Sequence, residues 1–185
     1  MSQQLLFGEK SHSDFAIFEA WQKSADELYR DFECAEPEID PFNFNEVASV
    51  SFLAAAAGRA RFVPLMESNL TKAYANDSGA ISEWKGRADL LLFAGRSRYV
   101  FEFKTCWRDP SDDQIKYCLD LAEKDAKSIS SVVDTAKYAG IVTCFDSSET
   151  CETCQKHESS TFSFAVMRSD NNSGAFFYFR ETVTN

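Results

Sequence analysis

The segment KGRADLLLFAGRSRYVFEFKTCW, residues 85–107, decides the fold expected for this chain. Its two runs of strand-forming residues flank the short turn AGRS and predict a β-hairpin. The same runs carry Asp89, Glu102 and Lys104. Burying an unpaired charge costs several kcal/mol, so these three side chains need a partner or a role.

The register of this hairpin follows from its turn. If the strands cover about 83–93 and 98–105 and the turn centres on the Gly-Arg pair, Asp89 lies directly opposite Glu102. Because side chains alternate along a strand, Glu102 and Lys104 then share one face with Asp89. The other face is apolar and contains Leu90, Leu92, Tyr99, Phe101 and Phe103.

Two carboxylates that face each other across a hairpin repel and destabilise the sheet. A divalent cation removes the repulsion, and Mg²⁺ is often bound by only one or two protein carboxylates. We therefore expect Asp89 and Glu102 to bind Mg²⁺ or Mn²⁺, with the backbone carbonyl of Phe103 as a further ligand. Lys104 would lie beside a metal-bound water, an arrangement suited to phosphodiester hydrolysis. The alternative is a pair of carboxylates at the rim of the sheet, bridged by Lys104 or Arg87.

Helices and strands alternate through the rest of the chain. Apolar spacing, capping residues and a terminating glycine predict the helices, and β-branched and aromatic runs predict the strands. The expected elements outside the hairpin are, in order, helix 14–32, helix 44–59, strand 61–68, helix 111–128 and strands 137–145, 161–169 and 174–183. Pro64 makes strand 61–68 an edge strand or a bulged one, and a loop is expected over 73–80. This order indicates an α/β fold with a central mixed β-sheet flanked by helices.

The length of 185 residues fits a single domain. We divide residues 1–185 into an N-terminal helical extension (1–43), a core (44–146) and a cysteine-containing loop with a C-terminal antiparallel hairpin (147–185).

Asp89, followed after twelve intervening residues by Glu102-Phe103-Lys104 on the next hydrophobic strand, resembles the PD-(D/E)XK nuclease superfamily. The resemblance covers about residues 44–146, where helix, three strands, helix and strand follow the order of that family. It implies a restriction endonuclease-like αβββαβ core, with the first helix and the C-terminal strands as additions. Ala88 stands where the name of the motif has a proline, which many members lack.

The resemblance also implies roles for individual residues. Asp89 and Glu102 match the metal-binding carboxylates, Lys104 matches the catalytic lysine, and Glu46 matches an acidic residue that many members carry on the helix before the sheet. A glutamate in the first turn also stabilises a helix through its dipole, which is a separate reason for Glu46.

A second resemblance is looser and concerns the start of helix 111–128. Gln114 is similar to the glutamine of the Q-x-x-x-Y element in the exonuclease branch, and this implies a contact with substrate. Cys118 stands at the tyrosine position, with Tyr117 one residue before it.

Four soft or borderline ligands occur within fourteen residues. Cys144, Cys151, Cys154 and His157 follow the pattern C-x6-C-x2-C-x2-H, which predicts a structural zinc site of four ligands. The alternative is a polar loop with incidental thiols.

The formal net charge of −10 at pH 7 argues, taken alone, against a polyanionic partner. Residues 58–116 nevertheless hold 10 Lys and Arg residues against 8 Asp and Glu residues. Lys85 and Arg87 lie next to the proposed site and are candidates for phosphate contacts; Arg59 and Arg61 are further candidates. An ordinary solvated surface explains the same charges equally well.

Composition and terminal sequence indicate the class of protein. Hydrophobic residues make up 44% of the chain and charged residues 26%, the balance of a globular protein. No apolar run is long enough for a membrane helix, and MSQQLLFGEK lacks the layout of a secretory signal. We expect a cytoplasmic protein without a membrane partner.

These features predict a Mg²⁺- or Mn²⁺-dependent nuclease that acts on DNA rather than RNA. A catalytically inactive module of the same fold, binding nucleic acid or a protein partner, is the first alternative. A purely structural protein with a chance E-x-K is the second. The oligomeric state is left open between a homodimer and a larger protein complex.

Overall fold

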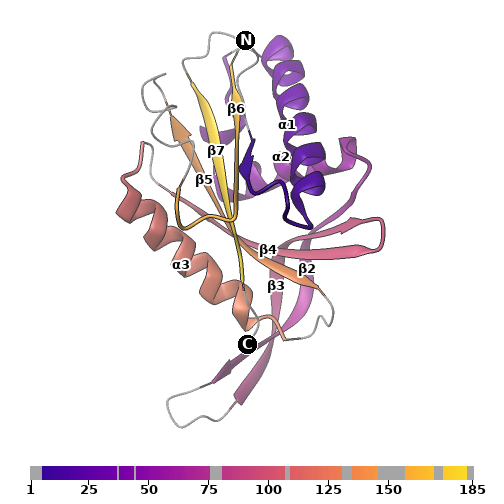
Figure 1. The fold of residues 1–185 in the computed structure, drawn as a ribbon, viewed down its shortest axis with the longest axis vertical. Coiled ribbons are helices and arrows are strands. Elements are labelled where there is room, and N and C mark those ends of the chain that lie inside the picture. The colour runs from indigo at the N-terminus through magenta and orange to yellow at the C-terminus, as the bar shows by residue number, and fades with distance from the viewer. Residues whose placement is uncertain are drawn as a thin grey trace.

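The computed structural model describes residues 6–36, 38–43, 45–75, 81–106, 109–130, 135–145, 157–168 and 173–182. Its elements are, in order, β1 (Leu6–Gly8), α1 (Phe15–Ala35), the 3-10 helix η1 (Pro41–Asn43), α2 (Glu46–Arg59), β2 (Val63–Ala75), β3 (Ile81–Ala94), β4 (Ser97–Thr105), α3 (Asp112–Ser128), β5 (Ala136–Phe145), β6 (Phe162–Met167) and β7 (Gly174–Glu181). The described strands form one seven-stranded sheet with the order β1-β6-β7-β5-β4-β3-β2 (Figure 1). This confirms the predicted α/β class and its mixed sheet.

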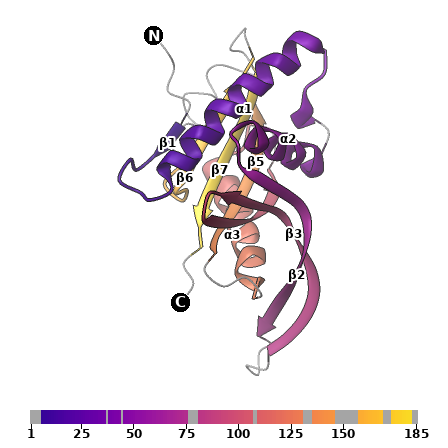
Figure 2. The same cartoon turned by 90° about the vertical axis from the view of Figure 1, so that its right-hand side faces the viewer.

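The sheet has a single parallel pair among its described strands, β4 with β5. Parallel neighbours need a crossover connection, and α3 supplies it. α3 packs on one face of the sheet, and α1 and α2 pack on the other (Figures 1 and 2). The three predicted helices, the β3–β4 hairpin and the antiparallel C-terminal pair are confirmed. β1 and η1 were not predicted.

Aromatic packing under α1 forms the larger part of the core. Phe18 and Trp21 of α1 are fully buried and lie against Phe101 of β4, with ring centroids 6.4 and 5.3 Å away. Phe18 also stacks on Phe162 of β6 with a centroid separation of 4.2 Å. The Trp21 indole donates a hydrogen bond of 2.8 Å to the Leu53 carbonyl, which joins α1 to α2. This packing fixes α2, and therefore Glu46, against the sheet.

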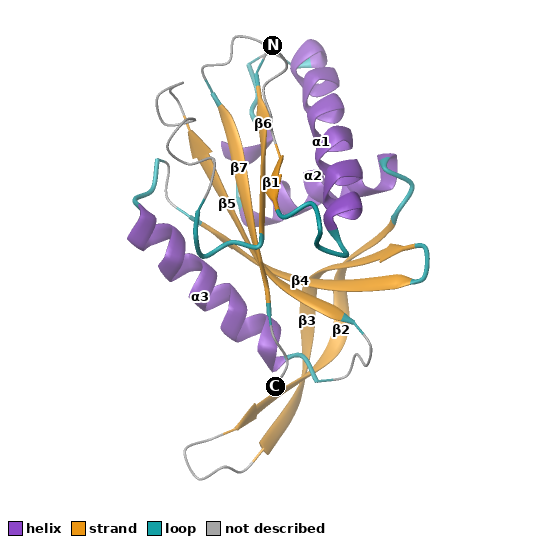
Figure 3. Cartoon of the chain, in the orientation of Figure 1, coloured by secondary structure: helices purple, strands orange, loops and turns teal. Residues whose placement is uncertain are grey.

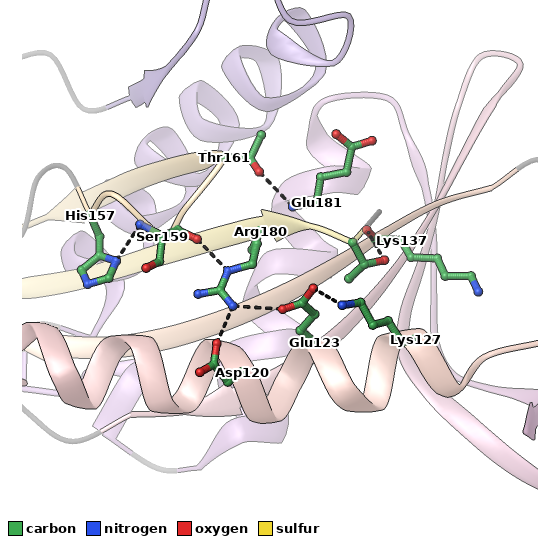
Figure 4. Close-up of polar contacts among 10 residues, drawn as sticks. Asp120, Glu123, Lys127, Lys137, His157, Ser159, Thr161, Arg180 and Glu181 are labelled. Atoms are coloured by element: carbon green, nitrogen blue, oxygen red, sulfur yellow. Dashed lines mark hydrogen bonds and ion pairs between the residues drawn. The ribbon is translucent and has the colours of Figure 1, made fainter. Parts of the chain in front are cut away.

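A charged network attaches α3 to the other face of the sheet (Figure 4). Arg180 of β7 lies 2.6 Å from Asp120 and 3.0 Å from Glu123, both on α3. Its Nε donates a further hydrogen bond of 2.7 Å to the Ser159 carbonyl. One side chain therefore connects the crossover helix, β7 and the segment before β6.

The β2–β3 pair extends beyond the helical layers as an arm (Figures 1 and 3). β2 is an edge strand, as Pro64 indicated. It continues to Ala75, so the prediction of a loop over 73–80 is wrong for residues 73–75. Residues 76–80 lie outside the described part. β3 pairs with β4 only from Leu90 onward, whereas it pairs with β2 along most of its length. β2 and β3 therefore extend beyond the end of the β3–β4 ladder as a pair.

No helix in the described part of the chain is both long and apolar enough to cross a membrane.

Candidate functional site

The site lies where β3 leaves β4. The predicted register is confirmed for five pairs, from Ala94–Ser97 to Leu90–Phe101. The apolar face is confirmed as well, since all five residues predicted to form it lie in the core against α1 and α2. The prediction that Asp89 pairs with Glu102 is wrong, because the ladder ends at Leu90–Phe101.

The reason lies on the neighbouring strand. Met66 pairs with Leu90 and Ser68 pairs with Ala88, so Glu67 stands opposite Asp89. The backbone of Glu67 has φ of 50°, a left-handed conformation that is strained for a residue with a side chain. The arm therefore changes direction at Glu67 and Asp89, and β3 separates from β4 at that point.

Beyond the last pair with β3, two carboxylates accept hydrogen bonds from backbone amides of β4. Asp89 Oδ2 accepts a hydrogen bond of 2.7 Å from the Phe103 amide, and Glu46 Oε2 accepts one of 2.9 Å from the Thr105 amide. These amides are two residues apart on one strand, roughly 7 Å. Asp89 and Glu46 line one small hollow together with Val47, Val50, Met66 and Glu67. The structure thus brings Glu46 of the second helix to Asp89.

The position of Glu46 follows from the start of α2. Asn45 caps the helix, and its side chain accepts a hydrogen bond of 2.9 Å from the Ala48 amide. Glu46 is the first helical residue, where the positive end of the helix dipole favours a carboxylate. The cap therefore sets both where the helix begins and where the Glu46 side chain points.

Glu102 and Lys104 lie beside these carboxylates and have partners that the sequence did not reveal. Glu102 is only 3% exposed, and its Oε1 lies 2.9 Å from the Lys72 ammonium of β2. That oxygen accepts no well-directed hydrogen bond from the described residues. The Lys104 ammonium lies 2.8 Å from Asp125 of α3.

Lys72 and Asp125 were not predicted from the sequence, although the sequence contains a feature that points to each. Gly86, in the middle of β3, indicates a close approach, because a Cβ there would lie 2.8 Å from the Lys72 side chain. Asp125 stands in the last turn of α3, where the helix dipole disfavours a carboxylate. A tertiary partner is one reason for such a placement, and here the partner is Lys104.

Burial raises the pKa of all three acidic residues of the site. It is the main cause for Glu46 and Asp89, where Lys104 and backbone amides act in the opposite direction. Burial raises the pKa of Glu102 to about 7, against the effect of Lys72. Burial also works against the charged form of Lys104, but the hydrogen bond and charge of Asp125 outweigh it and raise the pKa of that ammonium. Clustered acids with raised pKa values are typical of functional sites.

The donor set fits a hard divalent cation. Glu46, Asp89 and Glu102 offer carboxylate oxygens, and the buried Glu102 Oε1 lacks a directed hydrogen bond from the described residues. Within the described part, no three His, Cys, Asp or Glu side chains are already gathered closely enough to hold a metal. Mg²⁺ needs only one or two protein carboxylates, with water and phosphate as further ligands, so this observation leaves the fit intact.

Phe103 joins the site to the core. Its amide donates to Asp89, and its fully buried ring lies against Gly140 of β5, where a Cβ would come within 2.4 Å of it. The role of the Phe103 carbonyl as a metal ligand stays a prediction.

The predicted substrate-binding residues have different surroundings. Lys85 and Arg87 are exposed on the arm, and Arg87 lies 3.0 Å from Glu67. Gln114 belongs to a capping box with Ser111, whose amide donates a hydrogen bond of 2.8 Å to Gln114 Oε1. The capping box gives Gln114 a structural reason for its identity.

The described members of the predicted zinc set lie apart. Cys144 packs on the α1 face of the sheet, and its Sγ donates to the Phe42 carbonyl. His157 lies near Tyr178 on the α3 face; its Nε2 is 3.2 Å from the Asp112 carbonyl, and its Nδ1 accepts from the Ser159 amide (Figure 4). A single site that includes both Cys144 and His157 is therefore not formed as predicted. Cys151 and Cys154 lie outside the described residues.

Comparisons with known proteins found no matching family model, no matching curated protein and no matching solved structure.

Proposed function

We propose that this protein is a divalent-cation-dependent nuclease of the PD-(D/E)XK type that hydrolyses phosphodiester bonds in DNA. One observation carries the proposal: Glu46, Asp89, Glu102 and Lys104 gather from a helix and two strands at the point where β3 and β4 separate. Four sequence-predicted residues from separate segments thus lie in one charged, partly buried cluster.

The order of elements supports the same proposal. α2, β2, β3, β4, α3 and β5 follow the αβββαβ order of the restriction endonuclease-like core, with β4 and β5 parallel. In the proposed assignment α1, β1, β6 and β7 are additions to that core.

The charges of the site suit one divalent cation. Lys72 and Lys104 offset Glu102 and Asp125, whereas no ion pair with a described residue offsets Glu46 or Asp89. When both are ionised, two negative charges remain. Asp89 and Glu102 would hold the ion, with Glu46 near them, and the ion would supply Lewis-acid activation of the phosphoryl group and a lower pKa for water.

The remaining roles fall to the side chains of this chain. The Lys104 side chain is 32% exposed, so solvent reaches part of it, and its ammonium would orient the attacking water. The same ammonium stabilises the negative charge that develops on the phosphoryl oxygens. Asp125 favours the protonated form of Lys104 and holds its ammonium in place.

The test is incubation of the purified protein with duplex DNA, single-stranded DNA and RNA, in Mg²⁺, Mn²⁺ or chelator. We expect cleavage that requires the metal and is lost in Asp89→Asn and Lys104→Met, with DNA preferred. Cleavage that survives in both variants would contradict the proposed mechanism.

One observation favours an inactive module of the same fold as the second candidate. Each charged group of the site already has a partner within the protein: Lys72 for Glu102, Asp125 for Lys104, and backbone amides for Asp89 and Glu46. Nucleic-acid binding without cleavage under any of these conditions would support the module and exclude the nuclease.

A further inference from the structure

Glu102 forms an ion pair with Lys72. The Lys72 ammonium lies 2.9 Å from Glu102 Oε1, and the two side chains are 14% and 3% exposed. Lys72 comes from β2 and Glu102 from β4, two strands that the sheet order separates by β3. The lysine therefore crosses β3 to reach the carboxylate.

The path of Lys72 is shaped by a neighbouring residue. A Cβ on Gly86 of β3 would lie 2.8 Å from Lys72 Cδ and 2.9 Å from its Cγ. Any larger residue at position 86 would collide with the aliphatic part of Lys72, which is itself confined because it is mostly buried. Gly86 thus leaves the space through which the lysine reaches Glu102.

The contact is electrostatic rather than a well-directed hydrogen bond. Glu102 Oε1 accepts no hydrogen bond of good geometry from the described residues, although the Lys72 ammonium is within ion-pair distance. A buried carboxylate held in this way has an oxygen lone pair that a harder, doubly charged ion can use. One buried oxygen cannot serve an ammonium and a metal ion at full strength together.

We propose that Lys72 occupies Glu102 in the metal-free protein and competes with a divalent cation for that carboxylate. The inference rests on the proposed metal site but concerns a residue that no motif in the sequence indicated. Asp89 and Glu46 each have one oxygen bonded to a backbone amide and no ammonium to displace, whereas Glu102 Oε1 becomes available only when Lys72 withdraws. Lys72 therefore sets the metal concentration at which the site is complete.

The direct test is titration of the metal-free protein with Mn²⁺, followed by electron paramagnetic resonance of the free ion. We expect Lys72→Met to bind Mn²⁺ about tenfold more tightly than the wild-type protein, which corresponds to about 1.4 kcal/mol. Lys116→Met is the matched control, because Lys116 is exposed on α3 and the substitution removes the same charge. The control should bind Mn²⁺ as the wild-type protein does.

A second comparison assigns the effect to Glu102. In a Glu102→Gln background the carboxylate is absent, so Lys72→Met should raise Mn²⁺ affinity much less than tenfold, by the effect of the Lys72 charge on Asp89 alone. The rise in melting temperature on adding Mn²⁺ gives an independent readout if Lys72→Met is less stable. This rise should be larger for Lys72→Met than for the wild-type protein.

The outcomes separate the two proposals. Equal Mn²⁺ affinity for Lys72→Met, Lys116→Met and the wild-type protein would overturn the competition and leave the metal site standing. An undiminished tenfold gain in affinity in the Glu102→Gln background would also overturn it. Absence of binding by all variants at millimolar Mn²⁺ would overturn both the competition and the metal-dependent function.

Discussion

At the scale of single residues, the site combines groups that proteins normally keep apart. Glu102 is almost fully buried on a central strand, and its neighbours include the carboxylate of Asp89. Lys72 forms an ion pair with Glu102, and burial raises the pKa of the Glu102 carboxyl group to about 7. The protonation of Glu102 should therefore affect the stability of the folded protein.

The raised pKa of Glu102 predicts a pH dependence of stability in the presence of chelator. Burial raises this pKa from 4.5 to about 7, so between these pH values the folded protein binds more protons than the unfolded chain. The free energy of unfolding should then fall as the pH rises through this range, by roughly 3 kcal/mol at most. Glu102→Gln removes this contribution. Urea unfolding from pH 4 to pH 8 should give a smaller decline for the variant than for the wild-type protein.

Asp89 and Glu46 contribute slopes of the same sign, because burial raises their pKa values as well. They are present in both proteins, so the difference between the two pH profiles isolates Glu102. Parallel profiles would show that folding does not raise the pKa of Glu102.

At the scale of elements, β5 supports the site strand through a glycine. Gly140 packs against the ring of Phe103, and a Cβ there would lie 2.4 Å from a ring atom. Because Phe103 is fully buried, the ring has no free space in which to move. Gly140→Ala should therefore cost about 1–3 kcal/mol of unfolding free energy.

Gly58→Ala is the matched control for that substitution. A Cβ at Gly58 meets no described atom, and the residue lies inside α2, where alanine is the better helix former. Urea unfolding should show an unchanged or higher stability for Gly58→Ala. Equal stabilities for the two variants would contradict the close packing of β5 on Phe103.

The start of α3 gives a separate test of Gln114. Removal of the capping box by Ser111→Ala should cost about 1 kcal/mol, and Gln114→Ala should also lower stability. Gln114→Glu keeps the box and should keep the stability. If Gln114 acts only as a cap, nucleic-acid binding falls no further in Gln114→Ala than in Ser111→Ala; a larger loss in Gln114→Ala would assign Gln114 to the substrate.

The main elements could be predicted because each has a local signal. The spacing of Phe18 and Trp21 indicated α1, and the turn AGRS fixed the register from Ala94 to Leu90. The separation at Asp89 could not be predicted in this way, because it depends on β2 and on the backbone of Glu67. Local pattern thus placed the candidate residues on the elements where the structure has them, but it did not predict the contacts between them.

At the scale of the whole molecule, the two faces of the sheet are held by different forces. Aromatic side chains of α1 and α2 pack on one face, whereas α3 contributes no aromatic side chain to the core on the other face and is also held by Arg180. Asp125 of α3 forms an ion pair with Lys104, so the position of the Lys104 ammonium depends on how α3 packs on the sheet. The partners Lys72 and Asp125 escaped prediction because they belong to elements that meet only in the folded protein.

Arg180→Met should therefore lower the unfolding free energy by about 2 kcal/mol, since Arg180 makes ionic contacts with Asp120 and Glu123 and its side chain is only 17% exposed. Arg30→Met removes an exposed pair with Asp26 within α1 and should change stability by less than about 0.5 kcal/mol. Thermal and urea unfolding of both variants checks this. Equal losses would contradict the role of Arg180 in attaching α3.

The most direct measurement of the proposed function is the rate of DNA cleavage at saturating Mg²⁺ for the wild-type protein, Lys104→Met and Lys116→Met. We expect Lys104→Met to be slower by about a hundredfold to a thousandfold, the usual effect of removing one group that stabilises the transition state. Lys116→Met, which carries the same loss of charge on an exposed part of α3, should cleave as the wild-type protein does. Equal rates for Lys104→Met and the wild-type protein, or no Mg²⁺-dependent cleavage by the wild-type protein, would contradict the proposed function.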